Sequence, residues 1–238
     1  MTEIVIQGIG GRMGHVLCDM IAQREDCCVV AGIDMKDGEQ NGIPVYDSLE
    51  KLNGKGDVII DFSSPAAVEK ALPYCQTHKL PIVVCTTGLS EELQLKVVQL
   101  SRSVPVFKSA NMSMGINVLA ELCKRASAVL GINYDIEIVE QHHHNKLDAP
   151  SGTAITLAEG ILEKIDRKDK WVKGTFLAPD GTISGTNDCA PNELPISSIR
   201  EGEVFGLHTI RYESDVDTIS ITHDAKSRGG FVLGAVLA

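Results

Sequence analysis

Short apolar runs alternate with amphipathic helical patterns through the first half of the chain, and this alternation restricts the possible folds more than any other feature. Apolar strands are predicted at 3–7, 28–33, 57–62, 80–85 and 104–107. The segments between them begin like helices, because Ser64 precedes a proline and Ser90 precedes two glutamates. Parallel strands joined by right-handed helical crossovers satisfy this order. The sequence therefore predicts an α/β fold with a Rossmann-like, doubly wound parallel sheet.

The first strand runs directly into a glycine-rich turn, Gly8-Ile9-Gly10-Gly11-Arg12-Met13-Gly14. Glycines at this point let the backbone approach a dinucleotide pyrophosphate. The N-terminus of the next helix, predicted at 12–24, favours the negative charge. The spacing departs from Gly-x-Gly-x-x-Gly, because Met13 stands where the third glycine would fall. The turn indicates dinucleotide binding, with an ordinary tight turn as the alternative.

Asp34 stands at the end of the second predicted strand, where an acidic side chain can hold the ribose hydroxyls of the adenosine. A carboxylate there disfavours a 2′-phosphate and so favours NADH over NADPH, although Lys36 is close enough to weaken the preference. An ordinary turn residue is the alternative interpretation. Ligands of open α/β sheets bind at the carboxyl ends of the strands. Two further strand ends of this kind are Thr86-Thr87 and Ala110-Asn111-Met112.

The pattern changes after a helix predicted at 115–130. Helices are predicted at 115–130 and from 151 to about 167, and strands at 134–140, 196–200, 203–212 and 218–223. The strands alternate in the manner of an antiparallel sheet, which indicates a second, α+β domain. Segment 166–195, rich in charge, glycine and proline, is predicted to be a long loop with short elements. We expect residues 1–111 and 224–238 to form the dinucleotide-binding domain and residues 112–223 the second domain.

The run from Glu140 to Ala154, Glu-Gln-His-His-His-Asn-Lys-Leu-Asp-Ala-Pro-Ser-Gly-Thr-Ala, carries the strongest sign of chemistry. It joins the end of a predicted strand to the start of a helix, where side chains can be aimed at a ligand. If the strand continued, His142 and His144 would share one face and His143 the other.

Three interpretations of this run are open. A zinc site needs spaced ligands, and no such spacing is obvious, so no metal is predicted. A solvated polar loop is the second. The third is acid–base chemistry on an anion, because histidine titrates near neutrality and Lys146 adds a positive charge. Ser151-Gly152-Thr153 then offers hydroxyls and N–H groups at a helix N-terminus to a carboxylate or phosphate. A small acidic substrate that must be protonated fits this third interpretation.

Composition excludes some classes of partner. The formal net charge of −10 argues against nucleic acid. No apolar run is long enough to span a bilayer, and the N-terminus does not resemble a signal peptide, so we expect a cytoplasmic protein. Hydrophobic residues make up 43% of the chain and aromatic residues only 4%, as in aliphatic-rich α/β proteins. The seven cysteines contain no Cys-x-x-Cys pair and are interpreted as reduced, mostly buried residues.

Together these motifs closely resemble the 4-hydroxy-tetrahydrodipicolinate reductase (dihydrodipicolinate reductase) family of lysine and diaminopimelate biosynthesis. The resemblance covers nearly the whole chain, and its most specific part is the His-His-x-x-Lys-x-Asp-Ala-Pro-Ser-Gly-Thr run. It implies NAD(P)H-dependent reduction of a cyclic dicarboxylic acid with loss of water. It also implies a cytoplasmic homotetramer, assembled through the sheets of the second domain, which is then the substrate-binding and oligomerisation domain.

The resemblance also implies roles for individual residues. His142 matches the proton donor and Lys146 the catalytic lysine, and His143, Gly152 and Thr153 match substrate-binding positions. The positions expected to hold NADH or NADPH are Gly8, Ile9, Gly10, Gly11, Arg12, Met13, Asp34, Thr86, Thr87, Ala110, Asn111 and Met112.

Two other functions remain open. One is another two-domain NAD(P)-dependent reductase of the aspartate-derived pathways. Such enzymes commonly use a cysteine nucleophile or a lysine–aspartate pair. No cysteine here lies in a polar, loop-like context that would activate it. The other is a dinucleotide-binding sensor without catalysis, which would not need His142 and Lys146.

Overall fold

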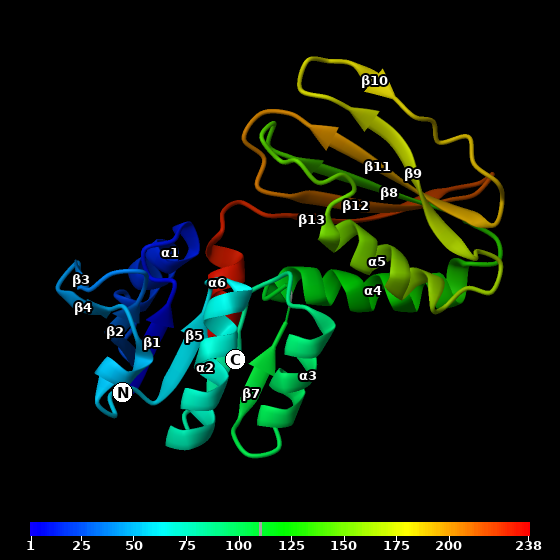
Figure 1. Cartoon of the computed structure of the whole chain (residues 1–238). Helices are drawn as coiled ribbons and strands as arrows, with labels where there is room; N and C mark the ends of the chain where they lie inside the picture. Colours follow the sequence, from blue (N-terminus) through cyan, green and yellow to red (C-terminus); the bar gives the residue numbers. More distant parts are fainter. Residues whose placement is uncertain (110) are drawn as a thin grey trace. The chain divides into compact units, whose positions relative to one another are not determined.

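The computed structural model describes residues 1–109 and 111–238 of the chain (Figure 1). The chain divides into two compact units. One comprises Met1–Ser113 together with Arg228–Ala238, and the other comprises Met114–Ser227. The C-terminal helix therefore belongs to the same unit as the N-terminal strands. None of the helices in the described part of the chain has the length and apolar character needed to cross a bilayer.

The first unit contains a seven-stranded sheet of order β3-β4-β2-β1-β5-β6-β7. Its strands are β1 (Thr2–Gln7), β2 (Cys27–Ile33), β3 (Gly38–Gln40), β4 (Ile43–Tyr46), β5 (Val58–Asp61), β6 (Ile82–Val84) and β7 (Val106–Lys108). All neighbouring pairs are parallel except the β3–β4 hairpin. This hairpin was not predicted, because its strands are too short to give a recognisable alternation.

Helices cover both faces of this sheet (Figure 1). They are α1 (Arg12–Ile21), the 3-10 helix η1 (Leu49–Leu52), α2 (Pro65–His78), α3 (Glu91–Leu100) and α6 (Gly229–Leu237). Alternation along β1 separates two cores: Val5 packs with residues of α2 and α3, whereas Ile4 and Ile6 pack with residues of α1 and α6. The predicted Rossmann-like, doubly wound sheet is confirmed.

Local signals set the helix boundaries. The side chains of Ser64 and Ser90 accept the N–H groups of Ala67 and Leu93, so both predicted serine caps are present. Helix α1 ends at Ile21, three residues before its predicted end, because the chain turns at Ala22. At Gly8, φ is +83° and an added Cβ would lie 2.5 Å from the carbonyl oxygen of Phe62, so only glycine fits this turn.

The second unit contains a six-stranded sheet of order β10-β9-β11-β8-β12-β13. Its strands are β8 (Asp135–His142), β9 (Lys170–Leu177), β10 (Ile183–Ser184), β11 (Glu193–Arg200), β12 (Leu207–Glu213) and β13 (Thr218–Asp224). Three of the pairings are antiparallel, and β11 is parallel to both β8 and β9. The predicted, mostly antiparallel sheet is confirmed, although the two parallel pairings were not foreseen.

Helices α4 (Met114–Leu130) and α5 (Gly152–Leu162) pack on one face of this sheet. The shared core includes Leu119 from α4, Ile161 from α5, and Ile138, Ile196 and Ile210 from the three central strands. Helix α5 ends five residues before its predicted end at Arg167.

The prediction of a long loop at 166–195 is wrong. Strand β9 occupies eight of these residues and pairs with β11 in the sheet. The sequence of this strand shows no clear alternation of apolar and polar residues, because it contains Lys170, Lys173 and Gly174. Several of its other side chains are half-buried rather than buried. Strand β8 also continues past its predicted end at Glu140, as far as His142. Strand β12 begins at Leu207, four residues after the predicted start.

Candidate active site

The glycine-rich turn lines a pocket of about 1120 Å³ in the first unit. Gly8, Gly10, Gly11 and Asp34 contribute to its wall, at the carboxyl ends of β1 and β2. The turn is held by the Gly8 N–H, which donates to the carbonyl of Ile33 at 2.8 Å. A dinucleotide pyrophosphate fits such a turn, because side-chain-free backbone faces the pocket and helix α1 starts there.

Asp34 is tied to the turn by hydrogen bonds. Its two carboxylate oxygens accept the N–H groups of Gly10 and Met35, at 2.8 and 2.7 Å. Each oxygen keeps a further lone pair for ribose hydroxyls. The other charged groups of the pocket wall are Asp47, Glu50 and Lys70. The wall therefore carries three carboxylates and one ammonium group, a balance unfavourable to an additional phosphate.

Gln7 also lines this pocket and is 2% exposed. Its amide nitrogen donates to Ser63 Oγ at 3.3 Å, but its buried Oε1 has no hydrogen-bond partner among the described residues. A buried carbonyl oxygen without a partner is unfavourable, so a donor from a bound molecule would be stabilising here. The residues present fit a dinucleotide.

The remaining predicted cofactor residues occupy different environments. Ile9 and Met112 are buried in the core beneath α1 and α6, so only their backbones remain for a ligand. Thr86 is buried, and its Oγ1 accepts the N–H of Ser63 at 2.9 Å. Arg12 and Thr87 are exposed, and Met13 and Asn111 are half-buried. Ala110 lies outside the described residues.

Gly14 is a residue whose importance the spacing rule concealed. A Cβ at this position would lie 2.3 Å from the carbonyl oxygen of Ile9 and 2.4 Å from that of Gly8. Gly14 therefore permits the close approach of α1 to the turn, one position later than the usual third glycine.

In the second unit, the core-facing side chains of β8 change from apolar to polar toward the end of the strand. Ile136 and Ile138 belong to the core, and Glu140 and His142 follow on the same face. Glu140 is 0% exposed and His142 is 7% exposed. The Nδ1 atom of His142 is hydrogen-bonded to Oε2 of Glu140. A carboxylate only accepts hydrogen bonds, so Nδ1 of His142 carries the proton of this contact.

Arg200, at the end of β11, completes this buried group. Its guanidinium donates to both oxygens of Glu140, at 3.1 and 2.8 Å. Burial alone would raise the pKa of Glu140, but hydrogen bonds from His142, Arg200 and Ser198 lower it to about 2. Glu140 is therefore ionised throughout the working range of an enzyme.

The loop after β8 carries the predicted lysine. Lys146 Nζ forms an ion pair with Asp148 at 2.8 Å, and its side chain is 23% exposed. The loop is fixed by backbone hydrogen bonds, including that of the His143 N–H to the carbonyl of Val204 at 2.7 Å. Because β8 ends at His142, the three histidines do not alternate as strand residues. His144 is exposed, and its Nδ1 contacts the carbonyl of Gly202 at 2.9 Å.

Helix α5 begins at the end of this loop. Ser151 is its N-cap, and its Oγ accepts the N–H of Ala154 at 3.2 Å. Gly152 and Thr153 form the first turn, and a Cβ added at Gly152 would meet nothing within 4 Å. The first turn of a helix carries N–H groups without intrahelical partners, which suits a carboxylate.

His208, on β12 opposite Glu140, was not predicted as a site residue. Its ring meets that of His142 edge-on, with centroids 5.2 Å apart, and its Nε2 lies 3.2 Å from Ser151 Oγ. Burial and the neighbouring His142 lower the pKa of His208 to about 3, so this imidazole is neutral at physiological pH.

Among the described residues, no group of three or more histidine, cysteine or acidic side chains is arranged to hold a metal ion. Burial raises the pKa of six thiols, to about 12 for Cys75 and about 11 for Cys123, so these thiols are not activated nucleophiles.

Comparison with known proteins defines the class. The family profile "Dihydrodipicolinate reductase, N-terminus" matches residues 2–112, and "Dihydrodipicolinate reductase, C-terminus" matches residues 115–238. A curated 4-hydroxy-tetrahydrodipicolinate reductase of Clostridium novyi is 38% identical over 100% of this chain and 91% of its own length. The corresponding Caldanaerobacter subterraneus reductase is 39% identical with the same coverage. The chain is therefore an NAD(P)-dependent oxidoreductase.

A solved structure agrees with these matches. The dipicolinate-bound dihydrodipicolinate reductase of Paenisporosarcina sp. TG-14 has a TM-score of 0.81 and 26% identity, covering 100% of this chain and 92% of that one. The chain belongs to the dihydrodipicolinate reductase family.

Proposed function

We propose that the chain reduces 4-hydroxy-tetrahydrodipicolinate to tetrahydrodipicolinate in lysine and diaminopimelate biosynthesis. Water leaves the substrate, and the conjugated imine that results takes up one hydride and one proton. NAD(P)H, when bound, supplies the hydride. The proposal is carried by the run from Glu140 to Thr153, which places an imidazole, an ammonium group and a helix N-terminus at one end of the second sheet.

His142 is the proposed proton donor. Its Nδ1 is engaged by Glu140, which leaves Nε2 to hold and release the transferred proton. Gly206 lies beside Nε2 of His142, and a Cβ added to this glycine would be only 3.2 Å from that nitrogen. A glycine at this position therefore keeps room beside the reacting nitrogen. Lys146 assists by stabilising negative charge that the substrate carries or develops.

The first turn of α5 is the proposed site for a substrate carboxylate. Gly152 and Thr153 present backbone N–H groups and a hydroxyl there, and His143 lies in the preceding loop. Dipicolinate, the molecule bound in the Paenisporosarcina relative, is itself a dicarboxylate. The substrate of this chain is a cyclic dicarboxylate of related shape, so the same chemistry of recognition applies.

NADH is the proposed preferred cofactor. Asp34 is fixed beside Gly10, and Asp47 and Glu50 add negative charge to the same pocket wall. A 2′-phosphate would meet these carboxylates, and among the described residues of the wall Lys70 alone supplies a compensating positive charge. Gly8–Met13, Thr86, Thr87, Asn111 and Met112 remain the proposed remainder of this site, with Ala110.

A cytoplasmic homotetramer is the proposed assembly. Helices α4 and α5 cover one face of the second sheet, and the other face carries polar pairs such as Thr209–Thr222 at 3.1 Å and Arg211–Glu137 at 2.9 Å. Sheets that face each other through such surfaces can associate without exposing an apolar patch. Sedimentation velocity of the protein checks the assembly, and a monomer at micromolar concentration would contradict it.

A coupled assay tests the reaction. The unstable substrate is generated in situ from pyruvate and aspartate semialdehyde by its synthase, and the absorbance of NADH or NADPH is followed. We expect oxidation that depends on the synthase, and faster oxidation of NADH. No oxidation with either cofactor, by protein that binds NADH, would refute the proposed activity in favour of a sensor.

The His142→Ala variant tests the acid. We expect kcat to fall roughly 10²–10⁴-fold, the usual contribution of a general acid, with the NADH dissociation constant unchanged. Unaltered turnover in the folded variant would remove His142 from the mechanism.

A further inference from the structure

Glu140 is a buried carboxylate whose oxygens are both fully engaged. Oε2 is bonded to His142 Nδ1 and accepts Nη1 of Arg200 at 3.1 Å. Oε1 accepts Nη2 of Arg200 at 2.8 Å and the N–H of Ser151 at 3.2 Å. A carboxylate with 0% exposure that accepts hydrogen bonds from His142, Arg200, Ser151 and Ser198 presents no surface to a ligand. Glu140 therefore acts on its neighbours.

Arg200 links this carboxylate to the loop that carries Lys146. It is 1% exposed and stands opposite His142 in the β8–β11 register. Besides Glu140, its Nη2 donates to the carbonyl of Asp148 at 2.5 Å. The side chain of Asp148 in turn holds Lys146 at 2.8 Å. One guanidinium therefore contacts two groups: Glu140, which is the partner of His142, and the backbone carbonyl of Asp148, whose side chain is the partner of Lys146.

Burying an ion pair is not by itself a route to stability, because desolvation offsets most of the attraction. Such a pair is better explained by what it orients. Here the Glu140–Arg200 pair touches three parts of the proposed site: the ring of His142, the loop at Asp148 and the N-terminus of α5 at Ser151.

We propose that Glu140 and Arg200 are positioning residues. In the neutral ring Glu140 holds the proton on Nδ1, so a second proton is added at Nε2, and it is this proton of the imidazolium that Nε2 releases to the substrate. Arg200 holds Glu140 and the Lys146 loop in register. Neither residue touches the substrate. This inference rests on the proposed role of His142 as proton donor at Nε2, and it adds the group that directs Nε2 toward that task.

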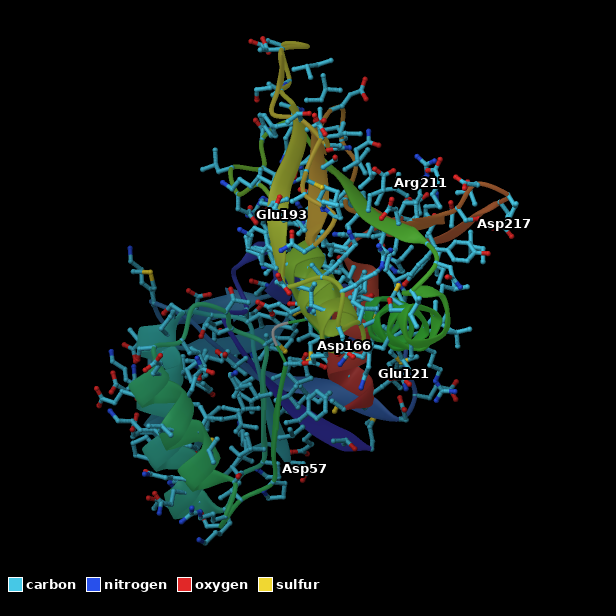
Figure 2. The ribbon with its side chains drawn as sticks, turned by 90° about the vertical axis from the view of Figure 1, so that its right-hand side faces the viewer. Asp57, Glu121, Asp166, Glu193, Arg211 and Asp217 are labelled. Carbon is cyan, nitrogen blue, oxygen red and sulfur yellow. The ribbon has the colours of Figure 1, made fainter. Side chains whose placement is uncertain are left out.

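The Glu140→Gln variant separates orientation from packing. Glutamine keeps the size of the side chain, but its amide can donate to Nδ1 and so favours the tautomer with the proton on Nε2. In a serine protease, the corresponding change of aspartate to asparagine leaves the geometry intact and yields the wrong tautomer. Glu121→Gln, on the exposed surface of α4, is the matched control, since it removes one carboxylate of the same unit away from the site (Figure 2).

The readout is the imidazole ¹⁵N spectrum together with kinetics. The chain has seven histidines, and a His142→Asn variant assigns the signals of His142. In the unsubstituted protein we expect neutral His142 to be protonated at Nδ1. In Glu140→Gln we expect the proton at Nε2 and a fall in kcat of ~10²–10⁴-fold with KM for the cyclic substrate little changed. The NADH dissociation constant and the Glu121→Gln control should stay at the unsubstituted value.

The other possible results of the tautomer and kinetic measurements also decide whether Glu140 is a positioning residue. A proton on Nε2 in the unsubstituted protein overturns the proposal without any variant, even if Glu140→Gln fails to fold. An unmoved tautomer in Glu140→Gln also overturns it, whatever happens to kcat. A moved tautomer with unchanged kcat upholds the positioning by Glu140 and refutes His142 as the proton donor instead.

Arg200→Lys tests the second half of the pair. Lysine keeps the charge but cannot form the two-pronged contact with Glu140 or reach Asp148 at the same time. We expect a loss of kcat with the His142 tautomer retained, because Glu140 remains a carboxylate. Unchanged kcat in this variant would limit the positioning role to Glu140.

Discussion

The substitution Gly14→Ala tests whether the close approach of α1 to the glycine-rich turn is what builds the cofactor pocket. The added Cβ would lie 2.3 Å from the carbonyl oxygen of Ile9 and 2.4 Å from that of Gly8, whereas ordinary contacts begin at 3.4 Å. The helix and the turn must therefore separate by about 1 Å, and overpacking of this kind costs about 1–3 kcal/mol. Alanine is favoured over glycine within a helix, so propensity offsets part of this loss.

The same displacement moves the N-terminus of α1 away from the pyrophosphate position. We expect the NADH dissociation constant to rise roughly tenfold or more, which corresponds to ~1.4 kcal/mol. Urea denaturation gives the change in stability, and calorimetric titration with NADH gives the affinity. Gly38→Ala is the matched control, because Gly38 has an ordinary φ and a Cβ there meets nothing within 4 Å. If Gly14→Ala bound NADH and resisted urea as well as this control, the steric reasoning would be refuted.

Four further outcomes are expected. The folded pKa of Glu140 is about 2 against an ordinary 4.5, so its contribution to stability is complete above pH 4.5 and is lost as the pH falls toward 2. Urea denaturation across this window should show a smaller loss in Glu140→Gln, and an equal loss would contradict the assignment. The pKa of His208 is about 3 against 6.5, so the unfolded chain binds more protons below pH 6.5 and stability falls from there toward pH 3. His208→Gln should flatten the stability curve between pH 6.5 and 4.5, unless another group causes its slope. Asp34→Ser should shift the ratio of NADH to NADPH affinity roughly tenfold toward NADPH, ~1.4 kcal/mol, and an unchanged ratio in titrations would exclude Asp34 as the determinant. Thr153→Val should weaken substrate binding more than NADH binding, and equal losses in both dissociation constants would remove Thr153 from the substrate site.

The sequence predicted the first sheet well because its signals are local. Each strand is a short apolar run, and Ser64 and Ser90 mark their helices by capping. The glycine-rich turn was recognised for the same reason. Its third glycine was not, since the rule counts positions, whereas the structure requires only that Gly14 face the carbonyls of Gly8 and Ile9.

The second unit was harder to predict because its order depends on pairing between distant segments. Strand β9 has two exposed lysines and several half-buried side chains, and its place is set by parallel pairing with β11. The same limit hid Arg200. It is sixty residues from Glu140 in sequence and becomes its partner only through the β8–β11 register. A buried arginine at a strand end gives no periodic signal that would reveal such a contact.

The two histidines at the end of the second sheet illustrate how register assigns chemistry. His142 and His208 are in edge-on contact, so protonating both rings would place like charges about 5.2 Å apart in a buried setting. Burial and His142 hold the pKa of His208 at about 3, and its Nε2 is engaged with the N-cap Ser151. His142 instead has a carboxylate at Nδ1. Of these two imidazoles, His142 is the one that is hydrogen-bonded to a carboxylate, which can balance the charge of an added proton. The sequence run 140–154 could not reveal this difference between the two histidines, because His208 lies outside the run and reaches the site from β12.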